Sequence, residues 1–217
     1  LRLAVESVKY GSKFIEDIEF SPEDASRTEP EFLFRVIEAV IEAGAKTVNI
    51  PDTVGYSEPE EYGNLIAAIK NNVSNIDKAM ISVHCHNDLG LVVANSICGA
   101  RGVLDAGYDA YINTCINGMG ERAGNADLVS VILAIKYGTG FRDKYFLDEK
   151  IDLKVAWRIC KYASYAFGVP IPINQPGIGA NAFAHESGIH ADGALKDRRN
   201  YELYDFEELG RGEPEII

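Results

Sequence analysis

The sequence has few cysteines, no long hydrophobic run and little positive charge. Its four cysteines include no Cys-x-x-Cys pair, which favours reduced thiols in a cytosolic protein over a disulfide framework. No apolar stretch is long enough to cross a bilayer, and the first residues lack a signal-peptide pattern. Only 21 lysines and arginines face 33 acidic residues, for a net charge of −12. These features predict a soluble, cytoplasmic protein that binds neither nucleic acid nor membrane.

What the sequence does contain is a repeated strand–loop–helix pattern. Apolar, β-branched segments begin near Ile15, Lys46, Met80 and Asp109, at the spacing of about 30 residues that a βα unit requires. Apolar residues at helical spacing follow each of them. The expected strands are 14–20, 46–50, 80–86 and 108–114, and the expected helices are 1–13, 32–43, 62–70, 89–104, 126–137 and 154–167.

Two of the expected helices begin with the same signal. Thr28-Glu-Pro-Glu31 and Ser57-Glu-Pro-Glu60 both match the capping-box pattern. Each places a proline in the first helical turn, where its missing N–H costs no hydrogen bond. Gly44 is expected to end the first of these helices.

Four consecutive βα units predict a parallel sheet. Polar motifs end all four strands, which favours a (β/α)₈ barrel, where such motifs converge on one face, over a doubly wound open sheet. A complete barrel needs about 250 residues, so we expect the first half of the barrel to lie upstream. The predicted fold is α/β: residues 1–140 form the second half of a catalytic TIM barrel, and 141–217 form a helical extension and the start of a linker subdomain.

The stretch from Met80 to Gly90, MISVHCHNDLG, is the most informative of these strand ends. Successive side chains on a strand point to opposite faces, so His84 and His86 project together, whereas Cys85 is expected to pack on the other face. Two convergent imidazoles make a metal site plausible. For an isolated His-x-His pattern, which is short, two hydrogen-bonded and chemically inert histidines would be the preferred interpretation.

Five motifs occur in a fixed order: EFSPEDASR, NIPDTVGYSEP, HCHNDLGLVVANS, NGMGERAGN and AFAHESGIHADG. Together they resemble the 2-isopropylmalate synthase family, within a group that includes homocitrate and citramalate synthases. The resemblance extends from about Ile15 to Tyr201. It implies a divalent metal ion (manganese, zinc or magnesium) at the mouth of the barrel and acetyl-CoA as co-substrate. The implied reaction is a Claisen condensation of acetyl-CoA with a 2-oxo acid, followed by thioester hydrolysis.

The resemblance also implies roles for particular residues. His84, His86 and Asn125 match the metal ligands, and the fourth protein ligand is expected to be an aspartate on the first barrel strand, which is not in this sequence. Glu23 and His190 match positions that act as an acid/base pair on the acetyl methyl group. His190 is expected to come from the partner subunit of a homodimer.

Ser21, Asn49 and Thr53 match positions that line the 2-oxo-acid pocket, although the residues alone would favour turn, strand-end and loop roles. Arg122 either supports a ligand or forms a local ion pair, and the sequence does not decide between them. The leading substrate is 3-methyl-2-oxobutanoate, giving 2-isopropylmalate in the first committed step of leucine biosynthesis.

Three alternatives stay open at this point. Homocitrate synthase would use 2-oxoglutarate, whose distal carboxylate needs a cation, and Arg27 is the one obvious strand-end candidate in the sequence. Citramalate synthase is the second alternative. The third is of a different class: a non-catalytic half-barrel subunit or fragment.

Overall fold

The computed structural model describes residues 1–212, which form two compact units. The first unit consists of Leu1–Thr114 and Gly120–Ala126, and the second of Cys115–Met119 and the residues from Asp127 onward. The predicted boundary near residue 140, which separates barrel motifs from the helical extension, stays a prediction.

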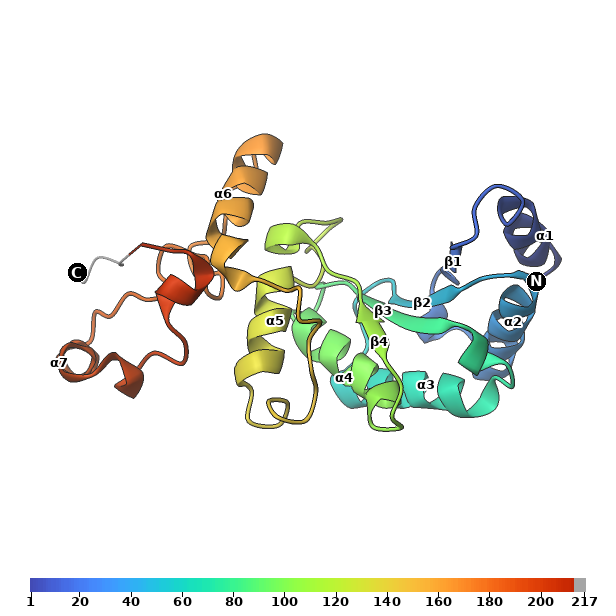
Figure 1. The fold of residues 1–217 in the computed structure, drawn as a ribbon, viewed down its shortest axis with the longest axis horizontal. Coiled ribbons are helices and arrows are strands. Elements are labelled where there is room, and N and C mark those ends of the chain that lie inside the picture. Colours follow the sequence, from blue (N-terminus) through green and yellow to red (C-terminus); the bar gives the residue numbers. More distant parts are fainter. Residues whose placement is uncertain (213–217) are drawn as a thin grey trace. The chain divides into compact units, whose positions relative to one another are not determined.

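The first unit is built on a four-stranded parallel sheet (Figure 1). The strands are β1 (Glu19–Phe20), β2 (Thr47–Asp52), β3 (Met80–Cys85) and β4 (Ala110–Ile112), and they lie side by side in chain order. A parallel sheet in sequential order requires a crossover between each pair of strands. The helices that make these crossovers are α2 (Pro30–Ala43), α3 (Pro59–Asn72) and α4 (Val92–Leu104), and α1 (Arg2–Gly11) precedes β1.

Helices α3 and α4 pack against each other and against the sheet (Figure 1). The hydroxyl of the buried Tyr62 on α3 donates to the carbonyl of Ile50 on β2. A Cβ added to Gly99 on α4 would collide with the Tyr62 ring and lie 3.1 Å from Val83 on β3. Glycine at this position therefore lets the helix approach both its neighbour and the strand.

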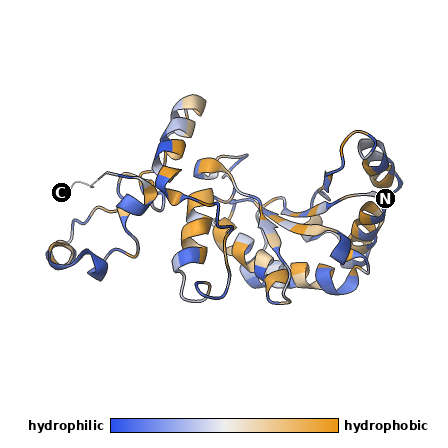
Figure 2. Ribbon diagram, in the orientation of Figure 1, coloured by the Kyte–Doolittle hydropathy of each residue, from blue (hydrophilic) through white to orange (hydrophobic). Residues whose placement is uncertain are grey.

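The sheet has one apolar and one polar face. Register places Asn49 beside Ser82, Pro51 beside His84, and Ser82 beside Tyr111. Side chains alternate along a strand, so neighbours in register project to the same face. We call this side, with Asn49, Ser82, His84 and Tyr111, the polar face. The buried side chains of the opposite, helix-covered face are Val48, Ile50, Ile81, Val83 and Cys85. In Figure 2, hydrophobic residues are seen along the strands and along α4.

The first strand is shorter than predicted. We expected a strand over 14–20, but only Glu19–Phe20 pairs with β2. The backbone N–H groups of Phe14 and Ile15 instead donate to the carbonyl of Gly11 and continue the end of α1. Both side chains are exposed, Phe14 at 71%. The start of this apolar segment therefore does not form a strand, because its backbone N–H groups are hydrogen-bonded to the end of α1.

Helix α2 begins and ends where the sequence indicates, but its predicted capping box does not form. Pro30 is its first residue, and Gly44 ends it with a left-handed φ of 119°. The N-cap is Glu29, which makes no side-chain cap hydrogen bond. The Thr28 hydroxyl donates instead to the carbonyl of Asp24, 2.9 Å away. Thr28 is thus bound to the loop after β1 and not to the helix.

Helix α3 has a different cap from the predicted one. The carboxylate of Glu58 accepts the backbone N–H of Glu61 at 2.7 Å, just ahead of Pro59. The Ser57 hydroxyl donates to Asp52, at 3.1 Å. Asp52 is fully buried at the end of β2, where a carboxylate needs hydrogen-bond donors. That requirement outweighs the capping role that the sequence pattern suggests for Ser57.

The second unit is helical. Its α-helices are α5 (Leu128–Tyr137), α6 (Ala156–Phe167) and α7 (Gly188–Lys196), which confirms the predicted helix that ends at Phe167. Its core includes Leu133, Cys160, Ile178, Phe183 and Leu209. Within residues 1–212 no helix is long and apolar enough to span a membrane. The 3₁₀ helices of both units are Ala25–Arg27, Ile76–Lys78, Ile116–Gly118, Leu153–Val155, Arg198–Asn200 and Phe206–Leu209.

Candidate metal and substrate site

His84 and His86 meet at the carboxyl end of β3. Their Nε2 atoms are 3.2 Å apart, and their rings lie edge to face with centroids 5.0 Å apart. Both Nδ1 atoms are buried without a hydrogen-bond partner in residues 1–212. Burial, the neighbouring imidazole of His84 and the charge of Arg122 together lower the pKa of His86. Each of these effects disfavours the imidazolium, so His86 tends towards the neutral form that can donate a lone pair to a metal ion.

Asn125 completes this cluster from the loop after β4. A backbone bridge pairs it with His86, in antiparallel sense. Its Nδ2 lies 3.4 Å from His84 Nε2 and donates to the carbonyl of Cys85 at 3.0 Å. Asn125 is 8% exposed. The structure thus brings together the three residues that the sequence predicts as metal ligands, although they are 41 positions apart at their extremes.

The donor set fits a divalent ion. Two unprotonated nitrogens 3.2 Å apart repel each other unless a proton or a cation lies between them. Two imidazole nitrogens bound to one ion at about 2.1 Å would subtend about 100° at that separation, an angle suited to tetrahedral or octahedral coordination. Among residues 1–212 no group of three or more His, Cys, Asp or Glu side chains is arranged to hold a metal ion. His84, His86 and the amide of Asn125 would therefore hold the ion, and their role as ligands stays a prediction.

Gly120 provides a direct test of the Asn125 position. A Cβ added at Gly120 would overlap Oδ1 of Asn125, so Gly120→Ala should displace the amide from the histidines. We expect divalent-metal affinity to fall about 10-fold, in the range typical of losses around a metal site. Competition with a chromophoric chelator measures it. Gly140→Ala is the matched control, because its Cβ would have no heavy atom within 4 Å. Equal affinities in the two variants would contradict the placement of Asn125.

Ser21 and Asn49 form a hydrogen-bonded pair beside the histidines' strand. Asn49 Nδ2 donates to the Ser21 hydroxyl at 3.1 Å, and that hydroxyl lies 3.3 Å from the carbonyl of Asn49. The Oδ1 atom of Asn49 is buried and has no partner in the described chain. Asn49 lies on the polar face of β2, beside Ser82, and Ser21 comes directly after the last residue of β1. The arrangement is compatible with the predicted substrate-binding role, which stays a prediction.

Thr53 links the loops after β1 and β2. Its hydroxyl accepts the backbone N–H of Asp24 at 2.9 Å. Asp24 has a left-handed φ of 62°, which this contact helps to hold. The neighbouring Glu23 is exposed, and its carboxylate has no hydrogen bond or ion pair within residues 1–212. An unpaired carboxylate next to a restrained turn suits a base, so the predicted role of Glu23 is chemically feasible.

Arg122, in the loop after β4, joins the loops that follow β2 and β3. Its Nε and Nη2 donate to the two carboxylate oxygens of Asp88 at 2.9 and 3.1 Å, and Nη2 also donates to the carbonyl of Thr53 at 2.7 Å. The hydrogen bond from Arg122 lowers the pKa of the Asp88 carboxyl. Arg122 thus makes a contact over 34 residues in addition to the local ion pair with Glu121, at 3.7 Å, that the sequence left open.

Cys85 lies on the opposite face from the histidines, as predicted. It is 1% exposed, and burial raises the pKa of its thiol to about 12. The thiol is therefore neutral and packs between β3 and the helices, next to Tyr62 and Ser96.

His190 belongs to the second unit, on α7. It is exposed, and its ring stacks against Tyr201 with centroids 4.3 Å apart. His185 is less exposed, and its Nε2 lies 3.5 Å from Glu202. The sequence did not single out Tyr201, which lies eight residues after the GIHADG motif. Glu23 and His190 lie in different units, so their action as one acid/base pair stays a prediction.

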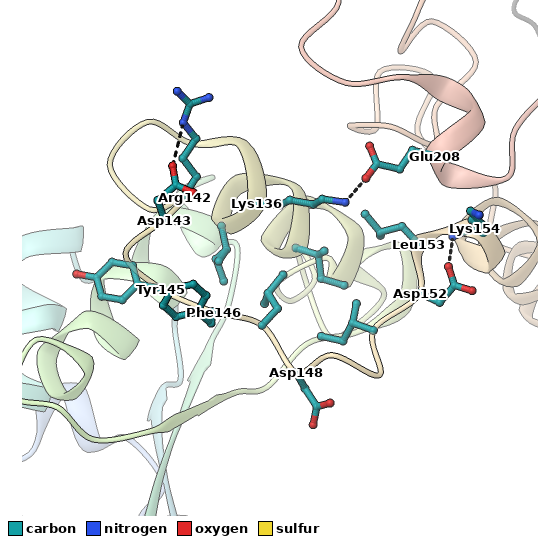
Figure 3. Close-up of a pocket in the computed structure, with 14 residues that line it drawn as sticks. Lys136, Arg142, Asp143, Tyr145, Phe146, Asp148, Asp152, Leu153, Lys154 and Glu208 are labelled. Carbon is teal, nitrogen blue, oxygen red and sulfur yellow. Dashed lines mark hydrogen bonds and ion pairs between the residues drawn. The ribbon is translucent and has the colours of Figure 1, made fainter.

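The second unit also contains a hollow of about 440 Å³ beside α5 (Figure 3). Its lining mixes aliphatic residues, such as Ile135, Ile151 and Leu153, with a larger number of charged ones, among them the ion pair between Lys136 and Glu208. None of the predicted site residues lines it.

The fold and the histidine cluster define a parallel βα protein with a candidate metal site at the carboxyl ends of its strands. Residues 1–162 match the HMGL-like family, and the chain belongs to that family. Residues 178–217 match a second family, described as homocitrate synthase post-HMGL domain-like.

Curated relatives are similar along almost the whole chain. A 2-isopropylmalate synthase of Halothermothrix orenii is 50% identical over 99% of this chain and 40% of its own length. The enzyme of the same name from Pyrococcus furiosus is 48% identical over 100% of this chain and 42% of its own. A Citrate (Re)-synthase of Dehalococcoides mccartyi is 50% identical over 95% of this chain and 49% of its own. The chain thus spans less than half the length of these relatives.

Solved structures share the fold at low sequence identity. An HMG-CoA lyase of Bacillus subtilis has a TM-score of 0.56 at 17% identity, over 77% of this chain and 54% of its own. An HMG-CoA lyase of Acinetobacter baumannii, in complex with coenzyme A and 3-methylmalate, has a TM-score of 0.57 at 15% identity, over 93% and 58%. With the parallel sheet, these neighbours confirm the predicted class: the C-terminal half of a TIM barrel followed by a helical region.

Proposed function

We propose that this chain carries the metal-binding part of a synthase that condenses acetyl-CoA with 3-methyl-2-oxobutanoate to give 2-isopropylmalate. The observation that carries the proposal is the convergence of His84, His86 and Asn125 at the strand ends. The name shared by several relatives at 46–50% identity supports the same reaction.

The site residues suit a 2-oxo acid. A divalent ion bound there would polarise the ketone as a Lewis acid. Two neutral imidazoles and an amide leave the charge of that ion available to the anionic substrate. In the Ser21–Asn49 pair, the Ser21 hydroxyl is a group that can donate to an oxygen of the 2-oxo acid, and it orients the substrate in the proposed complex.

The chemistry also needs a base. In the proposed reaction Glu23 removes a proton from the methyl group of acetyl-CoA, and the resulting carbanion forms a C–C bond to the ketone carbon. The ketone oxygen becomes an alkoxide and takes up a proton. Water then cleaves the thioester and releases CoA. We propose that His190, supplied by the partner subunit of a homodimer, shares this proton transfer with Glu23.

The charges at the strand ends favour a substrate with an uncharged side chain. Arg27 is paired with Asp24 at 2.8 Å, and Arg122 is paired with Asp88. Both guanidinium groups are thus already neutralised by carboxylates of the same unit. A 2-oxo acid with a second carboxylate would have to compete with those carboxylates for either arginine.

Citrate synthesis is the second candidate, because the Citrate (Re)-synthase relative is as similar as any 2-isopropylmalate synthase compared. Its 2-oxo acid would carry a second carboxylate, as would the 2-oxoglutarate of a homocitrate synthase. Citrate synthesis and homocitrate synthesis would each need an arginine that is already paired with a carboxylate. We therefore rank both reactions below the condensation with 3-methyl-2-oxobutanoate.

A thiol-release assay distinguishes these candidates. It uses the complete polypeptide in which this chain occurs, with acetyl-CoA, a divalent metal and one 2-oxo acid at a time. We expect kcat/KM for 3-methyl-2-oxobutanoate to exceed that for oxaloacetate, 2-oxoglutarate or pyruvate by at least about 10-fold, since one misplaced group in a pocket costs 1–3 kcal/mol. A preference for either dicarboxylate would overturn the substrate assignment, and no CoA release with any acid would overturn the reaction.

A further inference from the structure

The side chain of Arg122 is where three strand-end loops meet. Asp88 follows β3, Thr53 follows β2, and Arg122 itself lies in the loop after β4. Three hydrogen bonds of 2.7–3.1 Å connect these residues through one guanidinium. Asp88 is two residues from His86, and Arg122 is three residues from Asn125. The guanidinium therefore spans the two segments that supply the candidate ligands.

The backbone around this contact is close-packed. Arg122 has a left-handed φ of 53°, a conformation that a residue other than glycine keeps only where its surroundings enforce it. The carbonyl of Gly124 accepts the N–H of Asn87 at 2.9 Å. A Cβ added to Gly55 would lie 2.7 Å from the carbonyl of His86. The three loops are thus in direct contact, and the arginine lies at their junction.

Two roles are possible for an arginine at this place. It could bind an anionic substrate directly, or it could position the loops. The fork of N–H groups formed by Nε and Nη2 is already filled by both oxygens of Asp88. The remaining Nη1 faces the carboxylate of Glu121 at 3.7 Å. With each edge of the guanidinium next to an oxygen of the protein, positioning is the better explanation.

We propose that Arg122 and Asp88 are a pair of positioning residues that hold the loop of Asn125 against His84 and His86. The inference rests on the proposed metal-dependent function. A bidentate guanidinium–carboxylate pair fixes the relative orientation of two segments as well as their distance. Lysine cannot reproduce that fork, so charge alone at position 122 is not expected to be sufficient.

The Arg122–Asp88 ion pair is partly exposed, so its effect on metal binding can be tested separately from protein stability. The side chains of Arg122 and Asp88 are 41% and 27% exposed, and ion pairs of that kind contribute little to global stability. Variants should fold with almost unchanged melting temperatures. A change in metal affinity would then report on the local geometry of the site and not on unfolding.

The test compares Arg122→Gln, Arg122→Lys, Asp88→Asn and the double variant Arg122→Gln/Asp88→Asn in the complete polypeptide. Mn²⁺ affinity is measured without substrates, and the EPR spectrum of bound Mn²⁺ reports its coordination. We expect each single variant to lose about 10- to 100-fold in affinity, as found for groups that orient metal ligands. The double variant should be no worse than either single one, because the two residues act as a unit. Arg2→Gln is the matched control, since Arg2 forms an ion pair with Glu6 at 2.9 Å on α1.

Four results would overturn the inference. Direct substrate binding predicts a raised KM in Arg122→Gln with wild-type Mn²⁺ affinity and no effect of Asp88→Asn. Full affinity in Arg122→Lys would show that charge is sufficient and the fork is not needed. The variant His84→Ala separates the inference from the proposed function. Lost affinity in His84→Ala with wild-type affinity in both pair variants overturns the positioning role alone, whereas full affinity in His84→Ala overturns the metal site and the inference with it.

Discussion

Replacing both His84 and His86 by alanine is expected to abolish divalent-metal binding and the release of CoA. The two Nε2 atoms lie 3.2 Å apart. The double variant removes both imidazole donors and leaves, of the ligands proposed in this chain, only the amide of Asn125. An amide is a weak ligand without imidazole or carboxylate partners. A Lewis acid contributes several kcal/mol to such a reaction, so we expect kcat/KM to fall by at least about 1,000-fold.

Metal content after dialysis and the thiol-release assay measure the two effects separately. Ser82→Ala is the matched control, because Ser82 is a buried polar residue on the same face of β3, two positions before His84. It should keep full metal content. If the double histidine variant binds as much metal as wild type, His84 and His86 are a hydrogen-bonded pair and the metal site lies elsewhere.

The second large effect is expected for Glu23→Gln. Glutamine keeps the size and polarity of the side chain but cannot take up a proton. A positioned general base contributes about 10²- to 10⁴-fold, so kcat should fall within that range. The KM for the 2-oxo acid should change little, because the base acts on the acetyl group in the transition state.

Exchange of the acetyl-CoA methyl protons with deuterated solvent, followed by NMR, measures the proton-transfer step itself. Glu16→Gln is the control, since Glu16 is an exposed glutamate in the segment that leads into β1. Unchanged kcat with a raised KM in Glu23→Gln would make Glu23 a binding residue and return the role of base to another group.

Local patterns in the sequence were sufficient to predict the order of the elements. Strand propensity and helical periodicity identified four βα units, and the proline at the first position of α2 and of α3 and the left-handed Gly44 after α2 were correct. Alternation along β3 correctly placed His84 and His86 on one face and Cys85 on the other. These features depend on neighbours within a few residues, and such neighbours are visible in the chain itself.

The errors arose where another group, three to five residues away, competed for the same atoms. Ser57 has the sequence context of a helix cap, yet it donates to the buried Asp52, because a buried carboxylate costs more to leave unsatisfied than an exposed helix end. Phe14 and Ile15 have strand propensity, yet their N–H groups bond to the end of α1. In both cases a competing hydrogen bond to a group three to five residues away outweighed the preference that the pattern indicates.

The sequence by itself determined the βα order of the chain and the shared direction of the two histidines, because both follow from the periodicity of the backbone. Only the tertiary structure decided that Asn125 reaches the histidines, that Arg122 is bound by Asp88 and Thr53, and that Glu23 has no partner within residues 1–212. Such contacts depend on strand register and loop packing. Those are determined by the summed free energy of many distant groups and not by any local pattern.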